Sequence, residues 1–137
     1  MKLLAIDFGM KRMGFATGNT TINTATPIAP LERKNSKQVI DHIKDLILEY
    51  EIDKILLGYP LYMDGSKSHI TEQVEHFTRR LKKAVGESMQ VEWVDERLSS
   101  FEAEEQLKPL KPNYKKQKAI IDSMSAVVIL RRFMETA

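Results

Sequence analysis

The chain has 137 residues, of which 42% are hydrophobic and 29% charged, and its formal net charge is +2. This length and composition are typical of a single globular domain, residues 1–137, and leave no room for two lobes that close on a nucleotide. The absence of cysteine excludes disulfides and thiolate zinc sites. No apolar run approaches the ~18 residues that a membrane segment needs. The apolar run at the N-terminus ends at Asp7, too soon for a signal peptide, so we expect a cytoplasmic protein without a membrane segment.

Short apolar runs and turn signals predict three strands in the first part of the chain. Residues 3–6 form an apolar run that ends at Asp7 and predicts a buried strand. Residues 14–17 predict a strand that returns beside it. The Thr-, Ile- and Pro-rich stretch 21–31 predicts a third strand at an edge of the sheet.

Helices and strands then alternate. Hydrophobic periodicity and capping signals predict a helix from a cap at Ser36 to about 50, a strand at 55–57, a helix to 85, a strand at 91–94, a short helix from Ser99 to about 107, and a last helix at about 116–134. This order predicts an α/β fold with a central mixed five-stranded sheet flanked by helices. Because helical crossovers are right-handed, the first and later strands should end at one edge, where α/β active sites usually lie.

Carboxylates stand at that edge. Asp7 ends the first strand, and Asp95 and Glu96 end the last. Asp122 lies in a helix that is apolar on nearly all sides, so we expect its side chain to be buried. An unpaired buried carboxylate is costly, which favours a cation shared with Asp7, although a bond to a serine or exposure to solvent would also explain Asp122.

Without cysteine or a histidine pair, converging carboxylates favour one or two Mg²⁺ or Mn²⁺ ions, which activate water for phosphodiester hydrolysis. The three histidines, His42, His69 and His76, are weaker candidates because they lie on helices or beside a loop.

Two basic stretches are candidates for binding nucleic acid. Lys11 and Arg12 follow Asp7 in a glycine-bounded turn that would admit a bulky anion. Lys115 and Lys118 lie with Tyr114 in a segment that prolines should keep out of a helix, as a cationic loop beside Asp122. Both stretches are also compatible with a solvated surface.

Four segments together resemble the motifs of the YqgF (RuvX) family, in family order and spacing. They are LAIDFGMKRMG at 4–14, GYPLYMDGS at 58–66, DERLSS at 95–100 and IDSMSA at 121–126. The resemblance implies an RNase H-like fold, a distant relation to Holliday-junction resolvases, and a nuclease that matures the 5′ end of pre-16S rRNA. The implied partners are this RNA and ribosomal particles. We expect a monomer or weak homodimer.

The resemblance also assigns roles to residues. Asp7, Glu96 and Asp122 would be the catalytic, metal-binding triad, and Arg97 would contact phosphate or steady Glu96. Junction resolvases carry their second acid at the end of the strand that here ends in Leu57 and Gly58, so Glu96 would act from the neighbouring strand. Asp95 or Asp64 could replace or assist Glu96.

Three alternatives stay open from the sequence. The substrate could be a DNA junction, as for a resolvase, or the protein could be a non-catalytic nucleic-acid-binding factor in ribosome assembly. An Asp-x-Gly turn after a first strand also occurs in sugar kinases and actin-like ATPases, but those enzymes need a second lobe.

Overall fold

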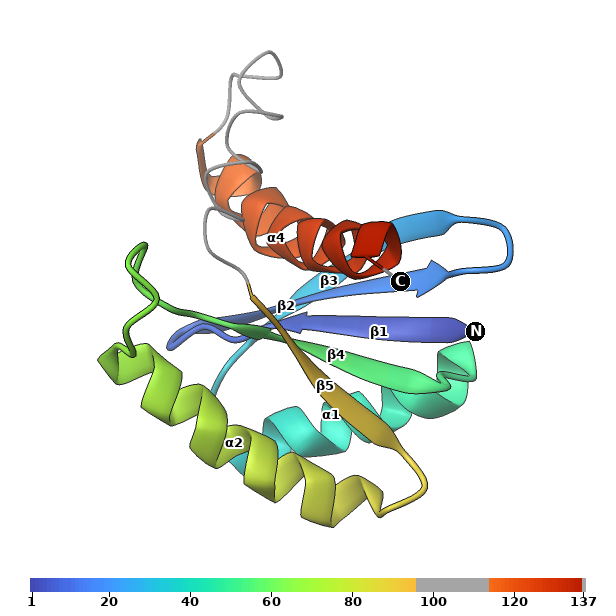
Figure 1. Cartoon of the computed structure of the whole chain (residues 1–137), viewed down its shortest axis with the longest axis horizontal. Coiled ribbons are helices and arrows are strands. Elements are labelled where there is room, and N and C mark those ends of the chain that lie inside the picture. The colour runs from blue at the N-terminus through green and yellow to red at the C-terminus, as the bar shows by residue number, and fades with distance from the viewer. Residues whose placement is uncertain (96–113, 137) are drawn as a thin grey trace.

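A central sheet lies between two helices on one face and one helix on the other (Figure 1). The computed structural model describes the backbone of residues 1–95 and 114–136, and the side chains of residues 1–95 and 123–135. In chain order the elements are β1 Lys2–Asp7, β2 Arg12–Asn19, β3 Thr24–Glu32, α1 Ser36–Tyr50, β4 Lys54–Tyr59, α2 His69–Val85, β5 Gln90–Asp95 and α4 Tyr114–Thr136. No helix in these described ranges is long and apolar enough to cross a membrane.

The sheet is mixed and has five strands in the order β3-β2-β1-β4-β5. The first three strands form antiparallel hairpins, whereas β4 runs parallel to β1 and β5 runs parallel to β4. The carboxyl ends of β1, β4 and β5 therefore meet at one edge, as the strand order and the handedness of crossovers predict. We call this edge the carboxyl edge.

The two faces of the sheet differ in the size of their side chains. The face under α1 and α2 presents large side chains, among them Leu4, Ile6 and Phe15. The face under α4 presents smaller ones, including Ala5 and Ala16, which pack against a buried stripe of α4. Alternation along each strand separates the two sets, because successive side chains point to opposite faces.

Helix α4 begins at the carboxyl edge and runs back across the sheet (Figure 1). In the first half of the helix, the Ser123 hydroxyl donates a hydrogen bond of 2.7 Å to the carbonyl of Ile28. Ile28 pairs with Phe15, which in turn pairs with Ile6 near the end of β1. Further along, the Leu130 side chain packs against Gly18, close to the start of β1. The helix therefore carries Asp122, the residue before Ser123, at the same end of the sheet as Asp7.

Two local predictions are wrong. The cap of α1 is Asn35 and not Ser36, because the Asn35 side chain accepts the Gln38 N–H at 2.8 Å. The last helix starts at Tyr114, so Lys115 and Lys118 lie in its first turns and not in a loop. The last proline, Pro112, precedes the helix in the sequence and therefore does not interrupt the backbone hydrogen bonds of the helix. The short helix expected from Ser99 lies outside the described residues.

Candidate active site

Asp7 stands at the carboxyl edge in a row without bulky neighbours. Its partner across the β1–β2 hairpin is Gly14, and the register of β1 with β4 places Gly58 on the other side. Asp7 follows Ala5 on the face covered by α4, and both glycines share that face and are buried. Glycine in a strand marks a place where a ligand or another backbone can approach closely. On both neighbouring strands, therefore, no side chain stands beside the half-buried Asp7.

The turn after Asp7 is tight and depends on Gly9. A Cβ atom at Gly9 would lie 2.1 Å from the carbonyl oxygen of Arg12, far inside ordinary contact. This closure exposes Lys11 and Arg12 directly beside the carboxyl edge. The prediction of a tight turn is confirmed, and the binding of nucleic acid by Lys11 and Arg12 stays a prediction.

Strand β5 ends at Asp95, the first of the two neighbouring acids in the segment 95–100 and the only one that the structure describes. Asp95 follows Trp93 on the face of α2, where the Trp93 indole bonds Thr78. Val94 packs on the opposite face, with the cluster under α4. Asp95 thus lies on the face away from Asp7, and its carbonyl accepts a hydrogen bond of 3.3 Å from the Arg132 guanidinium of α4.

Asp64 is committed to its own loop. Its carboxylate accepts the Ser66 N–H at 2.8 Å and the Ser66 hydroxyl at 2.6 Å, while Gly65 takes a positive φ of 87°. These bonds close the turn between β4 and α2. We therefore give Asp64 a structural role in that turn.

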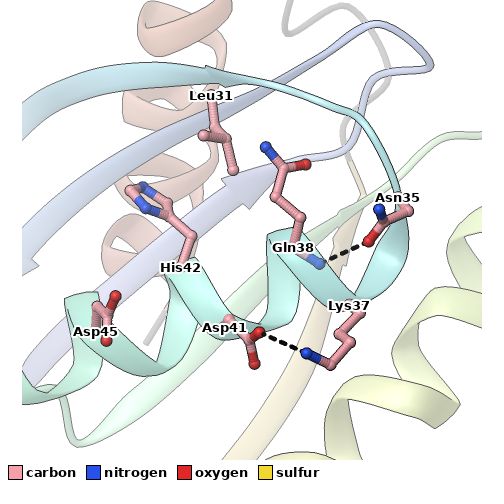
Figure 2. A pocket seen from close by; sticks show the side chains of 7 residues that line it. All are labelled: Leu31, Asn35, Lys37, Gln38, Asp41, His42 and Asp45. Atoms are coloured by element: carbon pink, nitrogen blue, oxygen red, sulfur yellow. Dashed lines mark hydrogen bonds and ion pairs between the residues drawn. The ribbon is translucent and has the colours of Figure 1, made fainter.

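The histidines do not join Asp7. His42 projects from α1 into a shallow hollow beside Leu31, with Asp41 and Asp45 nearby (Figure 2). Its ring packs against Phe15 at 5.3 Å, and Asp41 is paired with Lys37, which makes this hollow a poor metal site. His69 and His76 are exposed on α2.

Among the described side chains, no three His, Asp or Glu residues lie together as a metal-binding group. The side chains of Glu96 and Asp122 are outside the described set, as are those of Arg97, Lys115 and Lys118. Of the triad predicted from the sequence, the structure therefore describes the side chain of Asp7 and the backbone position of Asp122 on α4.

Helix α2 also begins on this side of the sheet, and its start is held firmly. Ser68 and Thr71 form a reciprocal capping box, and the Thr71 hydroxyl also donates to the carbonyl of Pro60. The N–H groups of a helix start carry partial positive charge, which favours anions nearby. Lys67 lies just before this helix and is ion-paired with Glu75 at 3.1 Å; the hydrogen bond to Glu75 and that carboxylate's charge raise its pKa.

Sequence reasoning missed one cation near the turn, Arg33. Its guanidinium lies 4.8 Å over the ring of Phe8 and 3.7 Å from the Met10 sulfur. The backbone N–H of Arg33 donates to the carbonyl of Lys11 at 2.8 Å. The signal was the basic pair at positions 33–34 directly after the third strand. Arg33 fastens the end of β3 to the turn and adds positive charge there.

These features define a class before any relative is considered. A five-stranded mixed sheet of order 3-2-1-4-5, with an acid at the end of its first strand and cations around it, is typical of nucleases with the RNase H-like fold. The particular family follows from comparison: the family model described as "RuvX: Holliday junction resolvase" matches residues 1–136. The chain belongs to this family, so the predictions of the RNase H-like fold and of a phosphodiester-cleaving nuclease are confirmed.

Relatives agree in sequence and in fold. A protein of Alcanivorax borkumensis named "Putative pre-16S rRNA nuclease" is 38% identical over 131 residues, which are 96% of this chain and 93% of the relative. Thermus thermophilus RuvC, solved with a Holliday junction substrate, superposes with a TM-score of 0.63 at 9% identity, covering 99% of this chain and 96% of RuvC. The fowlpox virus Holliday junction resolvase gives a TM-score of 0.58 at 15% identity and covers both chains completely.

Proposed function

We propose that this protein is a metal-dependent endonuclease that hydrolyses RNA phosphodiester bonds, with Asp7, Glu96 and Asp122 as its catalytic acids. The observation that carries the proposal is the position of Asp7. Its carboxylate stands between Gly14 and Gly58 at the carboxyl edge, on the face where α4 brings Asp122.

Alternation along β5 supports Glu96 over Asp95 as the second acid. Asp95 shares the face of Trp93 and α2, away from Asp7. Side chains alternate along a strand, so Glu96, the next residue in the chain, is the candidate that this pattern leaves for the face of Asp7. Gly58 lies in the strand between them and adds no side chain to obstruct a ligand.

The available donors fit a hard divalent cation. Asp7 is half-buried and no histidine or cysteine accompanies it, so the ligands at this edge are carboxylate oxygens, which suit Mg²⁺ or Mn²⁺. Asp7, Glu96 and Asp122 would hold one or two ions, which when bound supply Lewis acidity for attack by water on the phosphodiester. Lys11 and Arg12 would bind the phosphates that flank the cleaved bond, and Arg97, Lys115 and Lys118 would extend this contact along the backbone.

We propose precursor 16S rRNA as the substrate, free or within ribosomal particles, because relatives that match nearly the whole chain carry that name. Such a substrate would place the protein in the cytoplasm, acting as a monomer or weak homodimer. The family description favours a second candidate, a four-way DNA junction, which should be tested beside the RNA.

The test is cleavage of a 5′-extended 16S precursor fragment with Mg²⁺ or Mn²⁺. We expect Asp7→Asn, Glu96→Gln and Asp122→Asn each to lower the rate about 100-fold or more, the scale on which loss of one group that stabilises the transition state acts. Asp95→Asn is the matched control for Glu96→Gln, because it removes the same charge one residue earlier, and it should cut at nearly the wild-type rate.

The same experiment separates the alternatives. Full activity in Asp7→Asn would exclude the triad. A wild-type protein that binds the precursor with either metal and cuts neither RNA nor a four-way junction would be an assembly factor. Because removing one of several clustered carboxylates relieves repulsion in the metal-free protein, Asp122→Asn should melt at or above the wild-type temperature.

A further inference from the structure

A second surface with the chemistry of a nucleic-acid contact lies at the edge of the sheet, on the opposite face from Asp7. We call it the α2–β5 strip and define it by Tyr59 of β4, Trp93 of β5, and the two lysines at its ends, Lys67 and Lys82. It takes no part in the acid chemistry described above.

The Trp93 ring is held in place but remains open to solvent. It stacks on Tyr59 with a centroid separation of 4.4 Å and an interplanar angle of 26°. Its indole N–H donates to the buried Thr78 hydroxyl at 3.0 Å, and that hydroxyl donates to the Val74 carbonyl. Despite these contacts 42% of Trp93 is exposed. A rigid, half-exposed aromatic ring loses little conformational entropy when another flat ring stacks on it.

A lysine lies at each end of this ring pair, and one of them, Lys67, is ion-paired with Glu75 at 3.1 Å. Lys67 lies near the Tyr59 hydroxyl, which contributes to its raised pKa after the larger effect of Glu75. Lys82 is one helical turn after Thr78, on the same flank of α2, and lines a shallow cavity with Met89 and Val91, the residue two before Trp93 on β5. Within the described part of the chain, Lys82 makes no ion pair.

We infer that the α2–β5 strip binds a short stretch of single-stranded nucleic acid, with one base stacked on Trp93 and neighbouring phosphates against Lys67 and Lys82. An aromatic platform between cations is the arrangement by which proteins hold unpaired bases without reading their sequence. Asp95 lies on the same face as Trp93, two residues further along β5. Because its carboxylate would repel a phosphate there, the Trp93 ring would take a base and the lysines would take the phosphates.

The inference rests on the proposed function, because it gives the strip the same strand that the nuclease cuts. Trp93 is two strands away from Asp7 in the sheet order, which is about 10 Å at the usual strand spacing. A few nucleotides that pass over the carboxyl edge can span this distance. The strip would then hold an unpaired segment beside the cleavage site and favour substrates that have one.

Trp93 is the only tryptophan of the chain, so its intrinsic fluorescence reports on the strip directly. We expect a short uridine oligonucleotide to quench this fluorescence with a saturable curve at low salt. The same oligonucleotide annealed to its complement should quench weakly, because its bases are already stacked.

Substitutions test the two parts of the contact by fluorescence anisotropy of a labelled oligonucleotide. Trp93→Ala should weaken binding about ten-fold, while Trp93→Phe keeps an aromatic face and most of the affinity. Lys82→Ala should lower the slope of log affinity against log salt by about 0.7, the value for one phosphate contact of a single strand. Lys83→Ala is the matched control, because it removes the same charge from the next residue, about 100° around the helix.

The inference that the α2–β5 strip binds nucleic acid would be refuted by unchanged affinity in Trp93→Ala. It would also be refuted if Lys82→Ala and Lys83→Ala gave equal slopes of log affinity against log salt. Its failure can be distinguished from failure of the nuclease proposal. If Asp7→Asn stops cleavage while the oligonucleotide leaves Trp93 fluorescence unchanged, only the strip is wrong. If Asp7→Asn cuts normally while Trp93 is quenched and the variants behave as expected, only the catalytic assignment is wrong.

Discussion

Replacing Gly9 by alanine tests whether the turn after β1 positions the carboxyl edge for the proposed cleavage. The new Cβ would lie 2.1 Å from the Arg12 carbonyl oxygen, more than 1 Å inside normal contact, and the nearby atoms are backbone and cannot rotate away. Forcing an extra carbon into such a place costs about 1–3 kcal/mol. With unfolding entropy near 2.1 cal/mol/K per residue, a 137-residue chain would lose about 7 °C in melting temperature for a cost of about 2 kcal/mol.

The assay combines thermal unfolding with cleavage of the precursor RNA at a temperature where every variant is folded. Gly86→Ala is the control. Gly86 has a φ of 87°, which penalises alanine, but no atom lies within 4 Å of the position that its Cβ would take. Gly86 caps the carboxyl end of α2, away from the carboxyl edge of the sheet. We expect both variants to lose stability but only Gly9→Ala to lose activity. A Gly9→Ala protein that melts within about 2 °C of wild type and cuts at full rate would refute the reasoning.

Three further predictions concern single contacts. Leu130→Ala should cost about 2–5 kcal/mol in urea unfolding, because Leu130 is fully buried under α4. Lys2 lowers the pKa of Glu51 by a hydrogen bond of 2.7 Å and its charge, so this pair stabilises the fold above the ordinary glutamate pKa and loses its effect as the pH falls through the lowered value. Glu51→Gln should therefore be slightly less stable near neutral pH, most clearly at low salt, and equal to wild type in acid. Thr78→Val should shift the emission of Trp93 and cost about 1 kcal/mol, since it removes the acceptor of the indole N–H.

The sequence predicted the architecture well, for physical reasons. Short apolar runs bounded by glycine and proline marked the strands, and their alternation with amphipathic helices dictated parallel neighbours around the first strand. The start of α4 was placed two residues late because the lysines around Tyr114 have no apolar periodicity. The cap at Asn35 was missed because the adjacent Ser36 is an equally good capping residue.

The candidate site was only partly readable from the sequence. Asp7, Lys11 and Arg12 followed from a strand end and a glycine turn, which are local signals. The row that Gly14 and Gly58 form around Asp7 depends on strand register, and register is a tertiary property. The choice between Asp95 and its neighbour likewise needed the face of β5, which becomes visible only when Trp93 is placed against α2.

The unequal side chains on the two faces of the sheet have a consequence for how the protein tolerates change. Under α4, small residues such as Ala16, Gly18 and Ala126 determine how closely the helix settles on the strands. Enlarging any of them would tilt or raise the helix that carries Asp122, so a methyl group added in the interior would alter the distance between Asp122 and the carboxyl edge. The thickness of the buried layer between α4 and the sheet thus determines the spacing of the proposed catalytic acids. Substitutions in this layer, although remote from the acids, should be screened for lost turnover as well as lost stability.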